Sequence, residues 1–169
     1  MSAIAVPLRR RTYLSVEYTL RSWLLTTDHK RIAILYLISI TLMFFVGGAA
    51  ATLMRLNLLT PNSLLVDGDT YNKLFTMHGV VMVWFFLIPS IPSVLGNFLV
   101  PLMIGARDLA FPRLNLLSWY IYIVGALFTL GALLMGGVDT GWTFYTPFST
   151  SASTTNVVAT AVGIFILGF

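Results

Sequence analysis

The sequence places one histidine inside an apolar run that carries no formal charge. The run covers residues 74–106, and His78 lies near its start, followed by Gly79. A neutral imidazole can bind a metal or a haem iron through one ring nitrogen, or relay a proton, and Gly79 would let a flat macrocycle approach the backbone. The alternative is a histidine that is hydrogen-bonded to a neighbouring helix. The residue types alone leave both interpretations open.

Three further residues could accompany a cofactor bound by this histidine. Arg55 ends the preceding apolar run, at a depth expected to be similar to that of His78. An arginine at a helix end usually extends to the headgroups, but it can also donate hydrogen bonds to a polar edge of a cofactor. Trp142 and Tyr145 lie in a later polar segment. Such aromatic residues commonly line the membrane interface, and their N–H and O–H groups could instead bind anionic groups of a cofactor.

A second polar group lies between two apolar runs and contains Asn97, Asp108, Asn115 and Ser118. Asn115 and Ser118 are three residues apart, so they share a helix face. An aspartate at the mouth of a bundle, with amides and a hydroxyl beyond it, could collect protons and order water. In the alternative interpretation, Asp108 pairs with Arg107 or Arg113, and the amide caps the helix start.

The elements that must position these residues are membrane-spanning helices. The chain of 169 residues is 57% hydrophobic and 9% charged, whereas a soluble domain carries roughly 25% charged residues. Apolar runs at residues 32–54, 74–102 and 114–135 are long enough to cross a bilayer, and a fourth starts near residue 156. Pro89 and Pro92 should bend the second run. These features predict an all-α polytopic transmembrane helix bundle.

The net charge of +4 comes from residues at the ends of the apolar runs. This distribution favours membrane topology over nucleic-acid binding. Residues 1–31 form a basic segment that is expected on the cytoplasmic side, and an organellar transit peptide is the alternative. Residues 32–169 form the predicted transmembrane domain. Because the sequence has no cysteine, thiolate–zinc and iron–sulfur sites within this chain are excluded.

Four motifs, in this order, resemble subunit I of the haem–copper oxygen reductases, most closely cytochrome c oxidase: TTDHKRIAILYL, MHGVVMVWFFLIP, GNFLVPLMIGARDLAFPRLN and GVDTGWTFYTP. The likeness covers about residues 26–169. It is specific because four separate motifs occur in the family's order and spacing. Subunits of this family have about a dozen spans, so the resemblance implies that this chain is an N-terminal portion with three full spans and the start of a fourth.

The resemblance implies cofactor roles residue by residue. His78 matches the axial ligand of the low-spin haem in the second helix. Arg55 matches the arginine that hydrogen-bonds the formyl group of that haem in members with haem A. Trp142 matches the tryptophan that reaches the haem propionates, and Tyr145 is expected near them.

The resemblance also implies a proton pathway. Asp108 matches the mouth of the D pathway, and three residues match its lower polar lining: Asn97, Asn115 and Ser118. Tyr36 falls where a tyrosine of the first helix approaches the same pathway. No catalytic residue of the oxygen-reducing site is expected in this portion. The second axial histidine, the high-spin haem ligand and the copper ligands are expected further along the chain.

The implied cofactors are haem A and copper, and the implied partners are subunit II with a copper centre, subunit III, cytochrome c and the lipid bilayer, with no nucleic acid. The sequence has two histidines, and His29 lies before the first apolar run, so this portion alone is expected neither to hold a six-coordinate haem nor to reduce oxygen. The predicted location is the bacterial inner membrane with a cytoplasmic N-terminus. The mitochondrial inner membrane is a less favoured alternative, because of the long basic extension.

Two departures from the family pattern bear on specificity. Quinol-oxidising members carry an Arg, an Asp, a His and a Gln at positions where this sequence has Val46, Ala50, Thr70 and Lys73. This difference favours cytochrome c as electron donor, with a quinol oxidase or a non-catalytic membrane fragment as alternatives. Asn57 stands where some members have a glutamate that helps to bind a structural cation, which puts that cation site in doubt.

Overall fold

The computed structural model describes residues 12–14, 19–59, 61 and 65–168, and within them it contains helices and no strands. Three helices in that part of the chain are long and apolar enough to cross a membrane. The predicted all-α polytopic bundle is therefore confirmed. The arginine cluster at residues 9–11 of the basic segment lies outside the described residues.

The first span, α2 (His29–Asn57), begins at a capping aspartate and carries Arg55 in its last turn. The Asp28 carboxylate accepts the backbone N–H of Lys30 at 2.8 Å, which satisfies one of the free donors at the helix start. The helix is longer at both ends than the predicted apolar run of residues 32–54, because polar residues complete its first and last turns.

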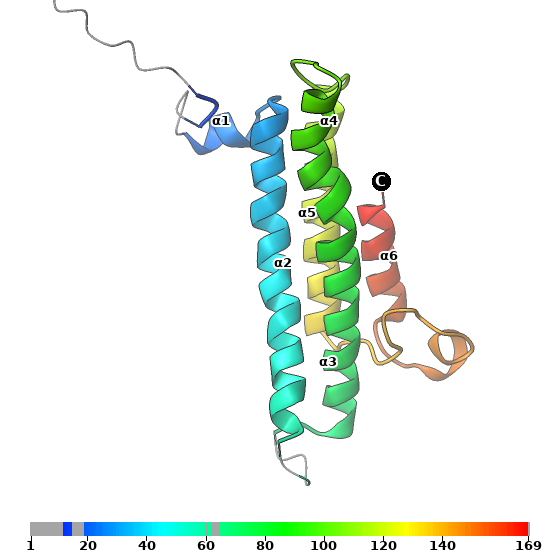
Figure 1. Ribbon diagram of the computed structural model, residues 1–169. Helices are drawn as coiled ribbons and strands as arrows, with labels where there is room; N and C mark the ends of the chain where they lie inside the picture. The colour runs from blue at the N-terminus through cyan, green and yellow to red at the C-terminus, as the bar shows by residue number, and fades with distance from the viewer. Residues whose placement is uncertain (1–11, 15–18, 60, 62–64, 169) are drawn as a thin grey trace, which may run out of the picture.

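The second span is one continuous rod with two π-helical segments inside it (Figure 1). Its parts are α3 (Gly68–Val80), η1 (Val81–Leu87), η2 (Ser90–Gly96) and α4 (Asn97–Met103). Pro89 has no N–H, so the Phe85 carbonyl lacks its usual partner four residues later. The Tyr122 hydroxyl of the third span donates to that carbonyl at 2.8 Å. A neighbouring helix thus satisfies the backbone group that the proline leaves free.

The third span, α5 (Pro112–Leu134), packs closely against the shorter α6 (Val157–Leu167). A Cβ added at Gly163 would lie 2.0 Å from Thr129 Oγ1, and one added at Gly125 would lie 2.9 Å from the Gly163 carbonyl oxygen. Two helix backbones can approach this closely only where the facing side chains are small. The fourth predicted apolar segment is therefore a helix held against the third span.

A short helix, α1 (Leu20–Leu24), lies across the end of α2 (Figure 1). Arg31 of α2 holds it in place, because its guanidinium donates to the Ser22 hydroxyl at 2.8 Å and lies 5.1 Å from the centre of the Trp23 ring. Arg31 is only 6% exposed. This basic residue is an internal anchor, and it does not contribute a solvated charge to the surface.

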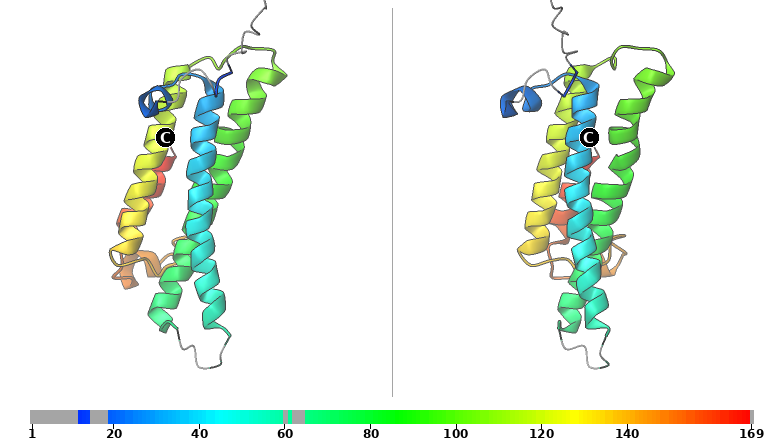
Figure 2. Two further views of the ribbon diagram at one scale, coloured as in Figure 1. Left: turned by 90° about the vertical axis from the view of Figure 1, so that its left-hand side faces the viewer. Right: turned by 60° about the vertical axis from the view of Figure 1, so that its left-hand side comes forward.

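The three spans run side by side along one axis (Figure 2). We call one end of the bundle the α1 end, where α1 and the connection from α4 to α5 lie. The opposite end carries the α2–α3 connection and the α5–α6 loop, residues 135–156, which includes η3 (Phe148–Ala152). Apolar side chains such as Leu42, Phe45 and Leu127 are at least 61% exposed on the spans. Such faces suit lipid or further protein.

Candidate functional site

His78 lies in α3 and reaches α2 across the interface between the two helices. Its Nδ1 is 2.9 Å from the carbonyl oxygen of Gly47. Because a carbonyl oxygen can only accept a hydrogen bond, Nδ1 carries the proton and, in the neutral ring, Nε2 carries the lone pair. The half-buried ring therefore presents a free nitrogen whose direction is fixed by a second hydrogen bond, as in metal-binding histidines.

The α5–α6 loop lies against the same stretch of α3. The backbone N–H of Gly141 donates to Thr76 Oγ1 at 2.9 Å, and Thr76 is fully buried. The next loop residue, Trp142, packs on Gly79, where an added Cβ would lie 2.7 Å from the indole Cδ1. The indole is thereby held against the residue that follows His78.

α3 supplies a single histidine, His78, which fits a haem iron better than a metal ion bound by protein side chains alone. Among the described residues there is no group of three or more His, Cys, Asp or Glu side chains that could hold a metal ion. A single oriented histidine such as His78 suits a haem, because the macrocycle supplies the equatorial nitrogens. The expectation that Gly79 leaves room for the macrocycle is wrong, because Trp142 fills that space.

The other predicted cofactor residues lie nearer the exposed edge of this end. Gly47 faces His78, and Arg55 follows Gly47 by eight residues, which is about 12 Å along a helix. The predicted similar depth of Arg55 and His78 is therefore wrong, because the two residues differ by about two helical turns. Tyr145 is 77% exposed, and Trp142 is 38% exposed. Of these three predicted partners, Trp142 is the one that the structure places beside His78, because its indole packs on Gly79.

At the α1 end, Asp108 pairs with His29 from the start of α2. Its Oδ1 lies 3.0 Å from His29 Nδ1 and accepts the backbone N–H of Leu109 at 2.7 Å. The His29 side chain is 5% exposed, whereas that of Asp108 is 39% exposed. The predicted alternative, a pair with Arg107 or Arg113, is therefore corrected. The carboxylate has solvent on one side and a buried imidazole on the other.

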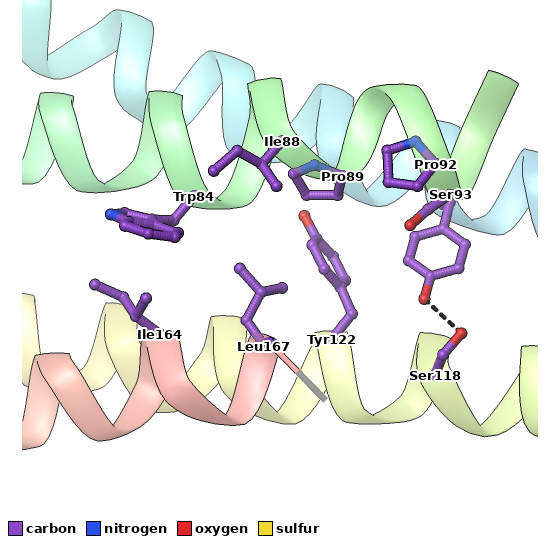
Figure 3. Close-up of a pocket in the computed structure, with 11 residues that line it drawn as sticks. Trp84, Ile88, Pro89, Pro92, Ser93, Ser118, Tyr122, Ile164 and Leu167 are labelled. Carbon is purple, nitrogen blue, oxygen red and sulfur yellow. Dashed lines mark hydrogen bonds between the residues drawn. The ribbon is translucent and has the colours of Figure 1, made fainter. Parts of the chain in front are cut away.

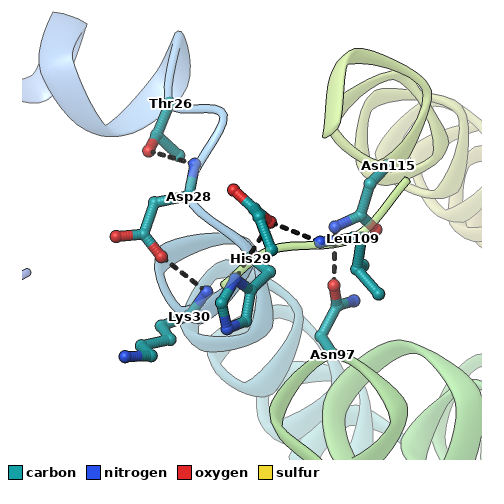
Figure 4. Close-up of polar contacts among 8 residues, drawn as sticks. Thr26, Asp28, His29, Lys30, Asn97, Leu109 and Asn115 are labelled. Atoms are coloured by element: carbon teal, nitrogen blue, oxygen red, sulfur yellow. Dashed lines mark hydrogen bonds and ion pairs between the residues drawn. The ribbon is translucent and has the colours of Figure 1, made fainter. Parts of the chain in front are cut away.

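The remaining predicted polar residues form one connected group across three helices. Asn115 Nδ2 donates to Asn97 Oδ1 at 2.5 Å (Figure 4), and the Ser118 hydroxyl donates to the Asn115 carbonyl at 2.7 Å. That bond uses the one hydroxyl proton of Ser118, so Tyr36 is the donor in the 2.8 Å bond between the two hydroxyls. The prediction that Asn115 and Ser118 share a helix face is confirmed.

A pocket of about 390 Å³ lies beside this group (Figure 3). Tyr36, Ser93 and Ser118 form part of its wall, and it extends to Leu167 of α6. Hydroxyl groups in such a space can order water. Sequence reasoning missed Ser93 and also Tyr122, which lines the same pocket. The available signal for Tyr122 was its position four residues after Ser118, on the same helix face.

Asp139 anchors the α5–α6 loop at the opposite end. Its Oδ1 accepts hydrogen bonds from the hydroxyl groups of Ser153 and Thr155, each at 2.8 Å. Partial burial raises the pKa of Asp139, but these bonds and the charge of Lys73 outweigh it, so the pKa is lowered overall. This stabilising contribution is present above the usual carboxyl pKa and is lost as the pH falls through the lowered value. The anchor is therefore intact at neutral pH.

The fold and the site define a class of protein. It is a polytopic helical membrane protein with a candidate haem ligand at one end and an aspartate-led polar group at the other. Comparison with known families makes the assignment more specific. A family described as Cytochrome C and Quinol oxidase polypeptide I matches residues 31–169. The chain belongs to this family, which is subunit I of the haem–copper oxidases.

Similar proteins carry two kinds of name. The chain is 40% identical over 141 residues to cytochrome c oxidase subunit 1 of Thermostichus vulcanus, covering 83% of this chain and 26% of that protein. It is 38% identical over 152 residues to quinol oxidase subunit 1 of Bacillus subtilis, covering 89% and 23%. A probable cytochrome c oxidase subunit 1-beta of Nocardia farcinica is 44% identical over 151 residues, covering 88% and 25%. The chain thus spans about a quarter of the length of these relatives.

Proposed function

We propose that this chain is the N-terminal portion of the catalytic subunit of a cytochrome c oxidase, which couples the reduction of oxygen to water with proton translocation. The observation that carries the proposal is the orientation of His78. Its Nδ1 is held by the Gly47 carbonyl, which leaves Nε2 free for iron. Membership of the family supports the same reaction class.

In this proposal, His78 would hold the iron of a low-spin haem A through Nε2. A haem bound there supplies one-electron transfer. The bond from Nδ1–H to Gly47 fixes the ring and raises the basicity of the ligating nitrogen. Trp142 would donate its indole N–H to a haem propionate, and Tyr145 would contribute at the exposed edge. Arg55, about two helical turns beyond Gly47, would have to extend back along α2 to reach the formyl group. The second axial histidine, the high-spin haem ligand and the copper ligands would come from the remainder of the complete subunit.

Asp108 is the proposed proton acceptor at the mouth of the D pathway. Its carboxylate is partly exposed and so can exchange a proton with water, while His29 and the Leu109 N–H hold it in position. Beyond it, amides and hydroxyls would order water toward the pocket beside α6: Asn97, Asn115, Ser118 and Tyr36. This direction carries protons from the α1 end into the bundle.

Cytochrome c is the proposed electron donor. At one of the positions where quinol-oxidising members differ, Lys73 packs on the α5–α6 loop, since a Cβ added at Gly137 would lie 2.8 Å from its Cδ. That contact supports a structural use of the position. A quinol oxidase is the second candidate, favoured by the likeness to the Bacillus subtilis protein. Oxygen consumption by the purified complex with reduced cytochrome c or with a quinol separates the two.

The proposed setting is the bacterial inner membrane, with the α1 end and the N-terminus in the cytoplasm. Subunit II, with its copper centre, and subunit III are the proposed protein partners. Positive charges near the α1 end, including Arg107 and Arg113, support this orientation. The division into a cytoplasmic segment of residues 1–31 and a membrane domain of residues 32–169 belongs to the same proposal.

The experiment that tests the proposal is His78→Ala in the complete oxidase. We expect the low-spin haem absorbance to disappear from the reduced-minus-oxidised spectrum, because no other described side chain replaces the axial nitrogen. His29→Asn is the matched control, since it alters the other histidine of this chain and should leave the spectrum intact. Retention of the low-spin band in His78→Ala would refute the ligand assignment.

A further inference from the structure

The α5–α6 loop rests on one face of α3. Three residues spaced three apart make this face: Lys73, Thr76 and Gly79. They contact successive parts of the loop. The Lys73 stem lies over Gly137, the Thr76 hydroxyl bonds the N–H of Gly141, and Gly79 receives the indole of Trp142. The register of the loop on the helix is therefore set by these three contacts.

Thr76 makes the directional contact of the three. Its hydroxyl donates to the Asn72 carbonyl at 3.1 Å and accepts the Gly141 N–H at 2.9 Å. The residue is 0% exposed, so water does not compete for either bond. The other two contacts are packing contacts, which fix distance but not the rotation of a peptide group. The hydroxyl thus determines how the peptide between Thr140 and Gly141 is oriented, one residue before Trp142.

The loop backbone connects the Thr76–Gly141 hydrogen bond to the indole of Trp142. Gly141 has φ +78°, a left-handed conformation that residues with a Cβ rarely adopt. The chain turns there, and Trp142 then packs on Gly79, one residue after His78. Thr76 lies one helical turn before Gly79 on the same face. A change at the hydroxyl would therefore reach the indole through two residues of loop backbone.

We propose that Thr76 is a positioning residue for the low-spin haem, since it holds Trp142 in place without touching the cofactor. This inference rests on the proposed function, in which His78 binds the iron and the Trp142 indole N–H bonds a propionate. An N–H donor at the propionate offsets part of its negative charge and favours the reduced iron. Loosening the indole should therefore make the haem harder to reduce.

Thr76→Val in the complete oxidase tests this inference, because valine keeps the side-chain shape and removes the hydroxyl. We expect the low-spin haem band to keep its amplitude and the midpoint potential to fall. The expected fall is up to tenfold in the equilibrium constant for reduction, which is about 59 mV for one electron. Thr76→Ser, which retains the hydroxyl, should restore the parent potential.

Two comparisons separate positioning from a general structural effect. Thr160→Val alters another fully buried threonine, whose hydroxyl has no hydrogen-bond partner among the described residues, and should leave the potential unchanged. Trp142→Phe should lower the potential by itself. Adding Thr76→Val to it should then lower the potential little further, because both changes act on one interaction.

The inference is overturned by an unchanged potential in Thr76→Val, or by full additivity with Trp142→Phe. Either result leaves the assignment of His78 as a haem ligand intact. That assignment is tested separately, by the loss of the low-spin haem absorbance in His78→Ala. Should Thr76→Val fail to assemble, Thr76→Ala carries the same prediction, since it removes the hydroxyl without placing a second methyl group against Gly141. A parent-like potential in Thr76→Ala would then overturn the inference.

Discussion

At the scale of single residues, the two histidines differ in the group that lies within hydrogen-bond distance of Nδ1. Nδ1 of His78 faces the Gly47 carbonyl, and Nδ1 of His29 faces the Asp108 carboxylate. The carbonyl fixes the tautomer that leaves Nε2 free for a metal. In the second pair, the buried His29 imidazole holds the Asp108 carboxylate, which is partly exposed. One histidine therefore suits a ligand, and the other suits the support of a proton acceptor.

This difference predicts graded effects on proton uptake. Asp108→Asn removes the ionisable group and should slow oxygen reduction, on the order of a hundredfold, with fewer protons pumped per electron. His29→Leu should slow uptake less, because the carboxylate remains but loses its buried partner. Stopped-flow measurement with a pH dye, and proton-to-electron ratios in vesicles, report both effects.

The control for these variants is Arg107→Gln, which removes an exposed charge one residue before Asp108 and should leave proton pumping unchanged. A normal proton-to-electron ratio in Asp108→Asn would contradict the pathway assignment. If His29→Leu matched the parent in uptake rate, the imidazole would have no role in supporting the carboxylate.

At the scale of helices, small residues decide how closely α5 and α6 approach. The Gly163 backbone lies against Thr129, and the Gly125 backbone lies against the Gly163 carbonyl. A membrane offers little hydrophobic force between helices, so such close van der Waals contact is a main source of their association. This pairing also brings Leu167 to the pocket that Tyr36 and Ser118 line.

Gly163→Ala should destabilise this pair, because the new Cβ would lie 2.0 Å from Thr129 Oγ1. We expect a cost of about 1–3 kcal/mol from overpacking. Gly131→Ala on α5 is the matched control, since an added Cβ there meets no atom within 4 Å. It should be neutral or slightly stabilising. Thermal unfolding of the complete oxidase measures both, and an equal loss in the two variants would argue against the close contact.

At the scale of the whole molecule, the two candidate sites lie at opposite ends of one bundle. His78 and Trp142 belong to the end that carries the α5–α6 loop, whereas His29 and Asp108 belong to the α1 end (Figure 1). The proposed redox cofactor and the proposed proton-collecting group are thereby separated along the spans. This separation suits an enzyme that couples electron transfer to proton movement across a membrane, provided that the α1 end faces the cytoplasm.

Because the chain has no cysteine, single cysteines can test that orientation. Thr150→Cys, exposed in η3, should react with a membrane-impermeant maleimide added outside intact spheroplasts. Arg107→Cys, exposed at the other end, should react only after permeabilisation, because positive charges favour the cytoplasmic side. Mass spectrometry identifies the labelled chain. Labelling of Arg107→Cys from outside, with Thr150→Cys labelled only after permeabilisation, would contradict the proposed topology.

The sequence by itself determined the helical spans and the residue types at both candidate sites. Apolar length and charge spacing are local properties, so the runs near residues 32–54, 74–102 and 114–135 could be read directly and were wrong only at their ends. The shared face of Asn115 and Ser118 was also predictable, because helical periodicity links residues three apart.

The tertiary structure alone decided which groups meet. His29 and Asp108 are 79 positions apart, and Thr76 and Gly141 are 65 positions apart. Their contacts depend on the rotation of each helix and on the path of a loop, neither of which is encoded locally. For the same reason Gly79 was misread as room for a cofactor, when its missing side chain makes room for Trp142. Hydrogen bonds between distant segments require atoms placed within about 3 Å, and only the packed helices place them.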